Sequence, residues 1–381
     1  MTQFNLPLHE LKESLRHQSI KEGFEIVRFA APKPPAAGVY FSDWLTSEGY
    51  GQMAWMAKDP EIRLNPKRFW PTVGVILVLG CNDRPPTQEV TWLAGKIKIS
   101  SYARHADYHT VLRQKMQNIC LWLEGELGYK PNTRLCVDSA PVLEKPLAAA
   151  CGVGWQGKNT LLVSRRFGCW LFLSEIFLEL PLEPDPPDSD HCGTCQRCQK
   201  ACPTQALEVA YRLDVQGCLA YYSIEHKGPI PREIRPLFGN RVYGCDDCLT
   251  VCPWNRFAPP TQHAEFVPLA SIFTLATPWD CATLTPSTFA KLFQKSPIKR
   301  IGLERFLRNL CVVMGNSRDL NALDSLMFLL RHPSLLVQGH AAWGLGQLGY
   351  QEAIVSLKKQ RNETTDLWLL EEIQGALRRL E

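Results

Sequence analysis

The chain has 381 residues, of which 45% are hydrophobic and 21% are charged, and its formal net charge is +4. These values are typical of globular domains and exclude a largely disordered chain, and the length predicts two or three domains. The N-terminal residues are polar and do not resemble a signal peptide, and no apolar stretch approaches the ~20 residues of a membrane span. We therefore expect a cytoplasmic protein with no membrane partner, whose thiols are reduced.

The first part of the chain, residues 1–180, is predicted to mix helices and strands. Residues 5–21 and 110–126 are predicted helices, whereas residues 74–79 and 170–180 have the length and apolar content of buried strands. Four prolines in residues 181–188 predict a linker, and prolines between 259 and 268 end the segment that follows. The predicted fold class is α+β, with an α/β domain at the N-terminus.

Asp138 follows a short apolar run and precedes a turn at Pro141. A carboxyl group held there could have a raised pKa and act as a general acid. The alternative is an Asp that caps a turn or a helix. The residues themselves leave both interpretations open.

Residues 151–159 read CGVGWQGKN, and three glycines match G-x-G-x-x-G. No clear strand precedes them, and Asn159 stands where a phosphate loop needs Ser or Thr, so a nucleotide site is not predicted. The glycines instead predict that the backbone approaches a large ligand closely. Lys158, Asn159 and Thr160 would then supply polar contacts.

Eight of the 15 cysteines lie in the 61 residues from Cys192 to Cys252. They form one C-x2-C-x2-C-x3-C-P run, one C-x2-C-x3-C-P run and a single cysteine between the two. In ferredoxins with this spacing, the fourth cysteine of a run binds the other 4Fe–4S cluster. That rule predicts two interleaved ligand sets: Cys192, Cys195, Cys198 and Cys252; and Cys202, Cys218, Cys245 and Cys248.

Zinc is the alternative ligand for C-x2-C pairs, but it does not explain why the longer pattern is repeated. Two adjacent clusters form a short electron path, so we expect a redox centre at its end. The other seven cysteines show no pattern and are interpreted as small buried apolar residues. They are Cys81, Cys120, Cys136, Cys151, Cys169, Cys281 and Cys311.

The last 80 or so residues are predicted to be helical, and small and apolar residues recur at shifts of 31 and 32. This pattern is typical of HEAT-type helix-pair repeats, with an ordinary helical bundle as the alternative. Residues 291–318 carry one acid, Glu304, and seven basic residues: Lys291, Lys295, Lys299, Arg300, Arg305, Arg308 and Arg318. Such a stripe indicates either nucleic-acid binding or a solvated surface. Residues 221–228, YYSIEHKG, either line a site or cap the ferredoxin-like segment.

Together these features resemble the epoxyqueuosine reductases, the cobalamin-dependent iron–sulfur enzymes of tRNA queuosine synthesis. The resemblance spans nearly the whole chain and is carried by MAWMAKDPEIRLNP, SYARHADYHTVL, VDSAPVLEKPLAAACGVGWQGKNTLL, IEHKGPIP, CDDCLTVCPWN and SPIKRIGLERFLRN. It implies a cobalamin-binding catalytic domain over 1–180 and a ferredoxin-like domain with two 4Fe–4S clusters over 181–258. Residues 259–381 would form HEAT-like repeats that bind tRNA.

The resemblance also implies site residues. Asp138 is the implied proton donor and lies against the cobalamin. The other implied or proposed cofactor contacts are Arg63, Tyr102, Lys158, Asn159, Thr160, Cys245 and Asp246. Asp107-Tyr108-His109 lacks the glycine of a D-x-H-x-x-G motif, so a base-off cobalamin without a histidine lower ligand is expected. The expected tRNA contacts are Glu225, His226, Lys227, Lys295, Lys299, Arg300, Arg305 and Arg308.

The implied reaction is reduction of the epoxide of epoxyqueuosine, at the wobble position of the tRNA anticodon loop, to queuosine. This is the last step of queuosine biosynthesis, and electrons would pass through both clusters to cobalamin from an unidentified reductant. We expect a monomer. One alternative is a cobalamin-dependent reductive dehalogenase acting on a small molecule, which leaves the basic stripe and the repeats without a role. The other is a non-catalytic electron-transfer module.

Overall fold

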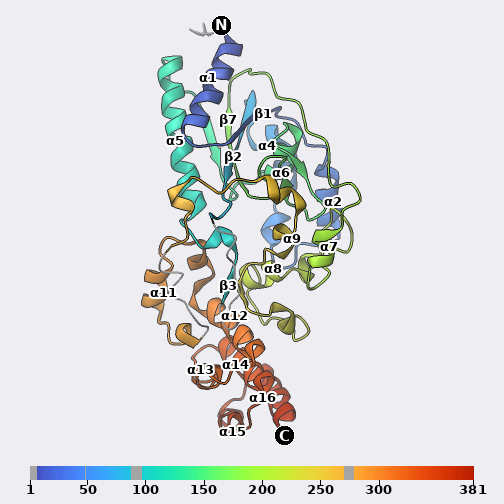
Figure 1. The fold of residues 1–381 in the computed structure, drawn as a ribbon, viewed down its shortest axis with the longest axis vertical. Coiled ribbons are helices and arrows are strands. Elements are labelled where there is room, and N and C mark those ends of the chain that lie inside the picture. The colour runs from blue at the N-terminus through green and yellow to red at the C-terminus, as the bar shows by residue number, and fades with distance from the viewer. Residues whose placement is uncertain (1–6, 48, 87–96, 270–278) are drawn as a thin grey trace. The chain divides into compact units, whose positions relative to one another are not determined.

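The computed structural model describes residues 7–47, 49–86, 97–269 and 279–381 (Figure 1). The chain forms two compact units, each assembled from separate segments. The first comprises Met1–Thr87, Ala106–Val215 and Asp247–Val267, and the second comprises Gln88–His105, Gln216–Asp246 and Pro268–Glu381. The units therefore do not follow the predicted boundaries, because the cysteine-rich segment 181–258 contributes to both of them.

A four-stranded antiparallel sheet forms the centre of the first unit, in the order β1 (Ile26–Ala30), β2 (Val75–Asn82), β7 (Leu171–Leu178) and β4 (Thr133–Cys136). All eight residues of β2 are buried, as an unbroken apolar run in a central strand requires. The two strands predicted from apolar runs are thus confirmed as β2 and β7. Their pairing, Val75 opposite Leu178 through Asn82 opposite Leu171, brings the two runs together.

Helices cover both faces of this sheet (Figure 1). Helices α1 (Leu8–Lys21) and α5 (Tyr108–Leu127) pack against each other and against the strands, and α6 (Glu144–Ala150) contacts β1 and β7. Both predicted helices are confirmed, although residues 5 and 6 of the first lie outside the described residues. The Asp107 side chain accepts the His109 N–H at the start of α5, which places Tyr108 and His109 on its first turn.

Short elements complete the first unit. They are α2 (Gly38–Thr46), α3 (Pro60–Leu64), α4 (Pro66–Phe69), β5 (Trp155–Gln156), β6 (Leu162–Val163), α7 (Arg197–Ala201) and α9 (Asp247–Thr250). β5 and β6 form a hairpin, and α7 packs on α9. Residues 181–188 contain no helix or strand, as their prolines predict.

The second unit is mainly helical. β3 (Lys98–Ile99) pairs in parallel with β8 (Arg241–Tyr243), and α8 (Leu219–Ile224) packs on β8. The C-terminal helices are α11 (Pro286–Leu292), α12 (Gly302–Ser317), α13 (Ala322–Leu329), α14 (Leu335–Leu348), α15 (Ala353–Glu363) and α16 (Leu367–Leu380). Helix α14 packs against α12 on one side and α16 on the other, so the segments aligned at shifts of 31 and 32 are stacked neighbours. The predicted helical C-terminal region is confirmed.

Among the described residues, none of the helices has the length and apolar character needed to cross a membrane.

Candidate active site and cluster-binding cavity

Four of the predicted cluster ligands surround one cavity in the first unit. The cavity has a volume of about 50 Å³ and is lined by Lys158, Asn159, Val163, His191, Cys192, Cys195, Cys198, Cys252, Pro253 and Trp254. All four cysteines are free thiols, although Cys252 lies more than 50 residues after the others in sequence. Four sulfur donors around one mostly apolar cavity suit a 4Fe–4S cluster. The structure therefore brings together the first predicted ligand set.

The loop that carries the first three cysteines is held by hydrogen bonds. The Cys195 N–H donates to the Cys192 carbonyl at 3.0 Å, and Gly193 between them has a φ of +48°, which glycine adopts without strain. The Trp155 indole N–H donates to the sulfur of Cys192 at 3.5 Å. Hydrogen bonds to ligand sulfurs influence the reduction potential of a cluster, so Trp155 belongs to the functional environment of this cavity.

Lys158 and Asn159, which we predicted to contact a large ligand, form hydrogen bonds to the cysteine loops. The Lys158 ammonium donates to the carbonyls of Gly193 at 2.6 Å and Cys195 at 3.0 Å. Asn159 is buried, and its amide donates to the Cys248 carbonyl at 3.2 Å. Both side chains thus join the β5–β6 hairpin to the two cysteine runs.

The glycine pattern also has an explanation within the chain. A Cβ on Gly154 would lie 2.1 Å from the carbonyl oxygen of Val163, and a Cβ on Gly152 would lie 2.5 Å from that of Pro186. These glycines allow backbone segments of this chain to approach each other, which corrects our expectation that they face a ligand. Thr160 has a φ of +63° in the turn of the same hairpin.

Cys169 was predicted to be only a small buried residue, but it lies beside the cavity. It packs with Trp155 and Val163, and the Asn159 amide contacts its sulfur at 3.8 Å. Its hydrogen bond to Cys252 lowers the pKa of Cys252 and so favours the thiolate form of this predicted cluster ligand. No spacing pattern connects Cys169 to the other cysteines, and the sequence offered no signal for this position.

The second predicted ligand set is divided between the units. Cys202 and Cys248 belong to the first unit, and Cys218 and Cys245 belong to the second. All four are partly buried, and none of them forms a disulfide bond.

Asp138 lies two residues after the end of β4, in a backbone conformation with a φ of +56°. Its side chain is 62% exposed. The Tyr108 hydroxyl donates to Asp138 Oδ2 at 2.6 Å, and His109 Nε2 lies 3.5 Å from the same oxygen. The other ring nitrogen of His109, Nδ1, is 2.9 Å from Asp107 Oδ1. The first turn of α5 thus supplies two proton-carrying groups to an exposed carboxylate.

The ionisation of Asp138 differs from our expectation. Partial burial raises its pKa, but the hydrogen bonds from His109 and Tyr108 outweigh burial, and the net pKa lies below the usual range. The predicted raised pKa is therefore wrong for this arrangement, because the sequence did not reveal which donors surround the carboxylate. Asp138 is ionised at neutral pH here, so it must receive a proton before it can donate one.

Two further carboxyl groups lie beside Asp138, and sequence reasoning missed both. The Asp138 N–H donates to Glu144 Oε1 at 2.6 Å, which fixes the loop after β4 to the start of α6. Glu175 is fully buried on β7. Burial, together with the nearby charge of Glu144, raises the pKa of Glu175 well above its usual range. Burial, together with the nearby charge of Asp138, also raises the pKa of Glu144. The sequence did contain a signal for Glu175, since a glutamate stands inside the apolar run that forms β7. Burying a charge at such a position is costly, which indicates an unusual carboxyl group.

Arg63 of α3 has the character of a ligand-binding side chain. Its guanidinium stacks on the ring of Trp55 at 5.2 Å. Its Nε is buried and has no hydrogen-bond partner among the described residues, and burial lowers its pKa. Such an unused donor fits a polar group of a large ligand, so Arg63 is compatible with the predicted corrin contact.

The other predicted corrin contacts belong to the second unit. Asp246 Oδ2 accepts the Ser101 N–H at 2.7 Å, and the Tyr102 hydroxyl contacts that of Tyr243 at 3.3 Å. These bonds connect the strand pair β3 and β8 with the residue next to Cys245.

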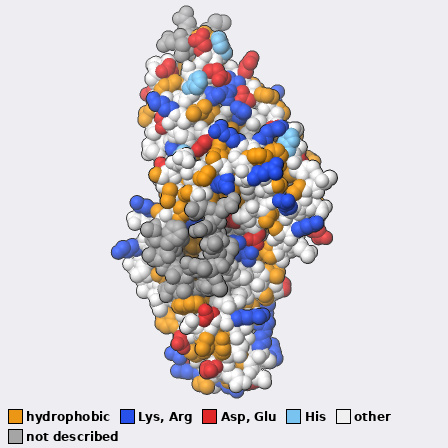
Figure 2. Space-filling model, in the orientation of Figure 1, with side chains coloured by type: hydrophobic (Ala, Val, Ile, Leu, Met, Phe, Trp, Pro, Cys, Tyr) orange, Lys and Arg blue, Asp and Glu red, His pale blue; other side chains and the backbone are white. Residues whose placement is uncertain are grey.

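The predicted tRNA contacts of the second unit fall into two groups. Lys227, Lys295, Lys299 and Arg300 are exposed, and Figure 2 shows other Lys and Arg side chains gathered over the helical end. Arg308 is fully buried, and it donates to the carbonyls of Tyr222 at 2.6 Å, His226 at 2.7 Å and Gly228 at 2.9 Å. The prediction that Arg308 contacts tRNA is therefore wrong, because its charge is enclosed by backbone.

Arg305 has a related role. It donates to the carbonyls of Ile301 at 2.8 Å, Ile224 at 2.7 Å and Arg300 at 3.1 Å. Arg305 and Arg308 thus hold the backbone around Glu225 and His226. Nδ1 of His226 is buried without a partner among the described residues, and burial lowers the pKa of this imidazole, so it is neutral at pH 7.

Comparison with known proteins identifies the family. A family model described as "Epoxyqueuosine reductase QueG, DUF1730" matches residues 63–139, and one for a "4Fe-4S double cluster binding domain" matches residues 191–255. The chain is 38% identical to the epoxyqueuosine reductase of Pseudomonas aeruginosa over 344 residues, which cover 89% of this chain and 95% of the relative. The chain belongs to the epoxyqueuosine reductase family.

Other epoxyqueuosine reductases agree with this assignment. That of Escherichia coli K12 is 34% identical over 349 residues, which cover 90% of each chain. A crystal structure of an epoxyqueuosine reductase with an epoxyqueuosine-modified tRNA-Tyr stem loop has a TM-score of 0.91 and 26% identity, and covers 98% of this chain and 100% of that one. A Bacillus subtilis epoxyqueuosine reductase whose catalytic loop is swung out of the active site has a TM-score of 0.89 and 25% identity, and covers 98% of this chain and 100% of that one. The family predicted from the sequence, an oxidoreductase family of tRNA modification, is thus confirmed.

Proposed function

We propose that this chain reduces the epoxide of epoxyqueuosine, at the wobble position of tRNA, to the alkene of queuosine. The reaction consumes two electrons and two protons, breaks both carbon–oxygen bonds of the epoxide and releases the oxygen as water. The observation that carries the proposal is the Asp138 carboxylate, which is exposed on a loop and has two proton-carrying neighbours in a chain of this family.

The first cluster would be held by the four cysteines of the cavity, Cys192, Cys195, Cys198 and Cys252. The second would use Cys202, Cys218, Cys245 and Cys248, and the match to a double-cluster domain supports two clusters. The family resemblance implies that cobalamin is also bound. Its candidate contacts, besides Asp138, are Arg63, Tyr102, Lys158, Asn159, Thr160, Cys245 and Asp246. When bound, the clusters and cobalamin supply single-electron transfer and a strongly reducing cobalt centre.

In this proposal Asp138 delivers a proton to the epoxide oxygen as the carbon–oxygen bond breaks. General acids of this kind contribute about 10²–10⁴-fold to a rate. Because its pKa is lowered, Asp138 needs a proton source. His109 is suited to this role, since Asp107 on its Nδ1 stabilises the imidazolium and its Nε2 faces Asp138.

Glu144 and Glu175 would position the acid. Glu144 accepts the backbone N–H of Asp138, so its carboxyl group sets the place of the loop. Burial raises the pKa of Glu175 well above its usual range, so this carboxyl group keeps its proton at neutral pH and adds no negative charge beside Glu144.

We further propose that the second unit binds tRNA phosphates through its exposed cations, Lys227, Lys295, Lys299 and Arg300. Arg305 and Arg308 would act indirectly, by holding the loop that carries Glu225 and His226. The modified base must leave the anticodon stack to be reduced. A related structure that contains a tRNA stem loop supports this assignment. In this proposal residues 1–180 catalyse the reaction, residues 181–258 transfer electrons and residues 259–381 bind tRNA.

The test is anaerobic reconstitution with iron, sulfide and cobalamin, followed by an assay on tRNA that contains epoxyqueuosine. We expect conversion to queuosine, and a loss of about 10²–10⁴-fold in the single-turnover rate for Asp138→Asn with unchanged tRNA affinity. His109→Gln should slow proton delivery to Asp138 and so reduce the rate of the first turnover as well as the steady-state rate. An untouched epoxide with fully loaded protein, or equal rates for Asp138→Asn and the unchanged chain, would refute the proposal.

A further inference from the structure

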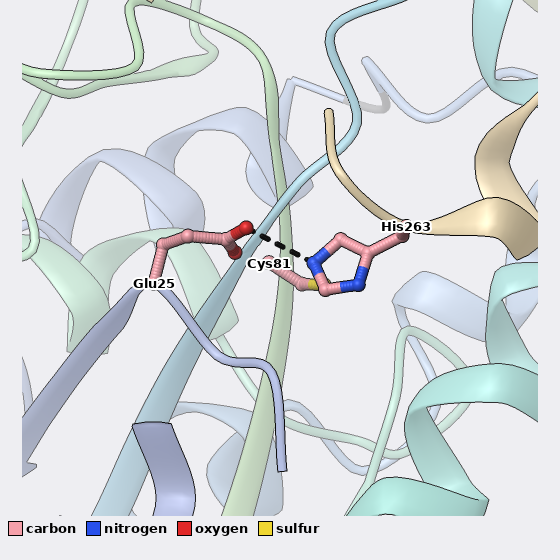
Figure 3. Close-up of side chains that lie close together, drawn as sticks. All are labelled: Glu25, Cys81 and His263. Carbon is pink, nitrogen blue, oxygen red and sulfur yellow. Dashed lines mark hydrogen bonds and ion pairs between the residues drawn. The ribbon is translucent and has the colours of Figure 1, made fainter. Parts of the chain in front are cut away.

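Three side chains with metal-binding atoms meet in the first unit, away from the predicted cluster ligands in sequence. Glu25 precedes β1, Cys81 lies on β2, and His263 lies in the segment after the cysteine runs (Figure 3). His263 Nε2 is 3.0 Å from Glu25 Oε1 and 3.3 Å from Cys81 Sγ. All three ligand atoms lie within 4.8 Å of one another.

These separations suit a shared metal ion. Zinc binds sulfur at about 2.3 Å and nitrogen or oxygen at about 2.0–2.2 Å with tetrahedral angles, so its ligands lie about 3.3–3.6 Å apart. The observed distances of 3.3 Å and 3.0 Å are within a few tenths of an ångström of that geometry. Only a small movement of side chains would admit the ion.

The backbone positions two of these side chains before any ion binds. The Glu25 N–H donates to the Gly80 carbonyl at 3.0 Å, and this bond places Glu25 beside Cys81 at the end of the β1–β2 pair. The Asn82 N–H donates to Glu25 Oε2 at 2.8 Å, which leaves Oε1 facing His263. Such support of a ligand by surrounding hydrogen bonds is typical of metal sites.

His263 is positioned by the other side of the site. Its N–H donates to the Thr261 hydroxyl at 3.2 Å, and the Thr261 N–H donates to the Arg84 carbonyl at 2.8 Å. The segment that carries the imidazole is therefore tied to the chain just beyond β2.

Hydrogen bonds among Glu25, Cys81 and His263 cannot satisfy all three side chains at once. His263 Nε2 carries at most one hydrogen, yet it faces both the Glu25 oxygen and the Cys81 sulfur. The thiol hydrogen has an alternative acceptor in the Gly23 carbonyl, at a long 3.6 Å. A divalent cation would satisfy the sulfur, the nitrogen and the oxygen at once.

The burial of these side chains and the charges around them also favour a bound metal ion. Cys81 is completely buried, and the side chains of His263 and Glu25 are 10% and 23% exposed. The charged groups that act most strongly on Cys81 are the carboxylates of Glu25, Asp83 and Glu265 and the ammonium of Lys115. Three carboxylates near one buried thiol favour a bound cation.

We propose that Glu25, Cys81 and His263 bind one zinc ion, with water as the fourth ligand. Mixed sulfur, imidazole and carboxylate donors suit zinc better than the harder magnesium or calcium. The ion would fasten the segment after Cys252 to the edge of the central sheet and so stiffen one wall of the sulfur-lined cavity. This role is structural and does not depend on the proposed reaction.

The test measures zinc in protein whose iron–sulfur clusters are loaded, because empty cluster cysteines also bind zinc. Protein purified anaerobically from zinc-supplemented cells is dialysed, and zinc and iron are measured by mass spectrometry. We expect about one zinc per chain, and a loss of most of it in Cys81→Ser and in His263→Gln with the iron content unchanged. The matched control is Cys120→Ser, a partly buried thiol on α5 that is hydrogen-bonded to Thr133, which should keep the zinc.

X-ray absorption at the zinc edge provides the second measurement. One sulfur at about 2.3 Å with nitrogen and oxygen at about 2.0 Å supports the site, whereas four sulfurs would place the zinc at cluster cysteines and overturn it. Loaded protein without zinc, or Cys81→Ser and His263→Gln proteins with normal iron and undiminished zinc, would also overturn it. If Cys81→Ser fails to accumulate, His263→Gln and Glu25→Gln decide the outcome.

Discussion

The two units bury charge in opposite ways. In the first, Glu175 is fully buried and the charges that act on it are other carboxylates, those of Glu144 and Asp138. In the second, the buried guanidinium of Arg308 is enclosed by carbonyl oxygens, and that of Arg235 forms a two-bond ion pair with Glu372 at 2.8 and 2.9 Å.

The difference separates a reactive arrangement from a structural one. Carboxyl groups that share an environment without a buried cation hold protons at pH values where free glutamates are ionised, so they are poised for proton exchange. Guanidinium groups whose donors are used have no such freedom and fix the backbone around them. We therefore locate the chemistry near Asp138 and assign the buried arginines to folding, and the predictions below test that contrast.

The largest expected effect follows from Arg308→Met. The change leaves one buried and two partly buried carbonyls without their donor, so the free energy of unfolding should fall by about 3–5 kcal/mol. Chemical denaturation monitored by circular dichroism measures this. Lys295→Met, which changes an exposed side chain, should alter the value by less than about 0.5 kcal/mol. Equal effects of the two substitutions would contradict the structural role of Arg308.

Glu175→Gln tests the carboxyl pair through pH. In the folded protein Glu175 keeps its proton at pH values where an unfolded glutamate has lost it, so the unfolded state binds fewer protons and stability falls as pH rises above about 4.3. Removing this group should reduce that fall by about 1.4 kcal/mol per pH unit, measured by denaturation between pH 5 and pH 8.

The control for this experiment is Glu179→Gln. Glu179 is a glutamate whose pKa is lowered by hydrogen bonds from Thr72 and Asn132, so it is ionised throughout this range in both states. The dependence of stability on pH should therefore be unchanged. An unchanged dependence in Glu175→Gln as well would show that Glu175 is ionised in the folded protein.

Tyr108→Phe tests the control of Asp138. It removes the hydroxyl that donates to Asp138 at 2.6 Å but keeps the ring stacked on Phe172, with centroids 4.5 Å apart. The pKa of Asp138 should rise, so the decline of single-turnover rate at high pH should move upward by about one pH unit. Tyr129→Phe, at an exposed tyrosine, should leave the profile in place. A downward shift in Tyr108→Phe would argue against Asp138 as the acid.

The smallest effect is expected for one exposed cation of the helical unit. Lys299→Ala should weaken tRNA binding by less than about tenfold and reduce the slope of log K against log salt by about 0.7–0.9, as loss of one phosphate contact predicts. Fluorescence anisotropy at several salt concentrations measures both quantities. Lys21→Ala, at the end of α1, is the comparison. Identical slopes for both proteins would remove Lys299 from the tRNA surface.

Much of the architecture was predictable because it depends on local patterns. The runs in residues 74–79 and 170–180 are apolar and became the two central strands, and the periodic segments became α1 and α5. The division into units was not predictable, since it depends on where the chain leaves and re-enters each core. Within the site, the spacing of the cysteines anticipated which four gather around the cavity.

The sequence by itself determined the central strands and the group of cysteines around the cavity, because apolar runs and the spacing of cysteines are local patterns. It also indicated the family, through a resemblance that spans nearly the whole chain. Tertiary structure alone decided the ionisation of Asp138, the burial of Arg308, the place of Cys169 and the meeting of Glu25 with His263. The reason is physical: a pKa or a metal site depends on which groups surround an atom. In this chain those groups come from positions up to 238 residues apart.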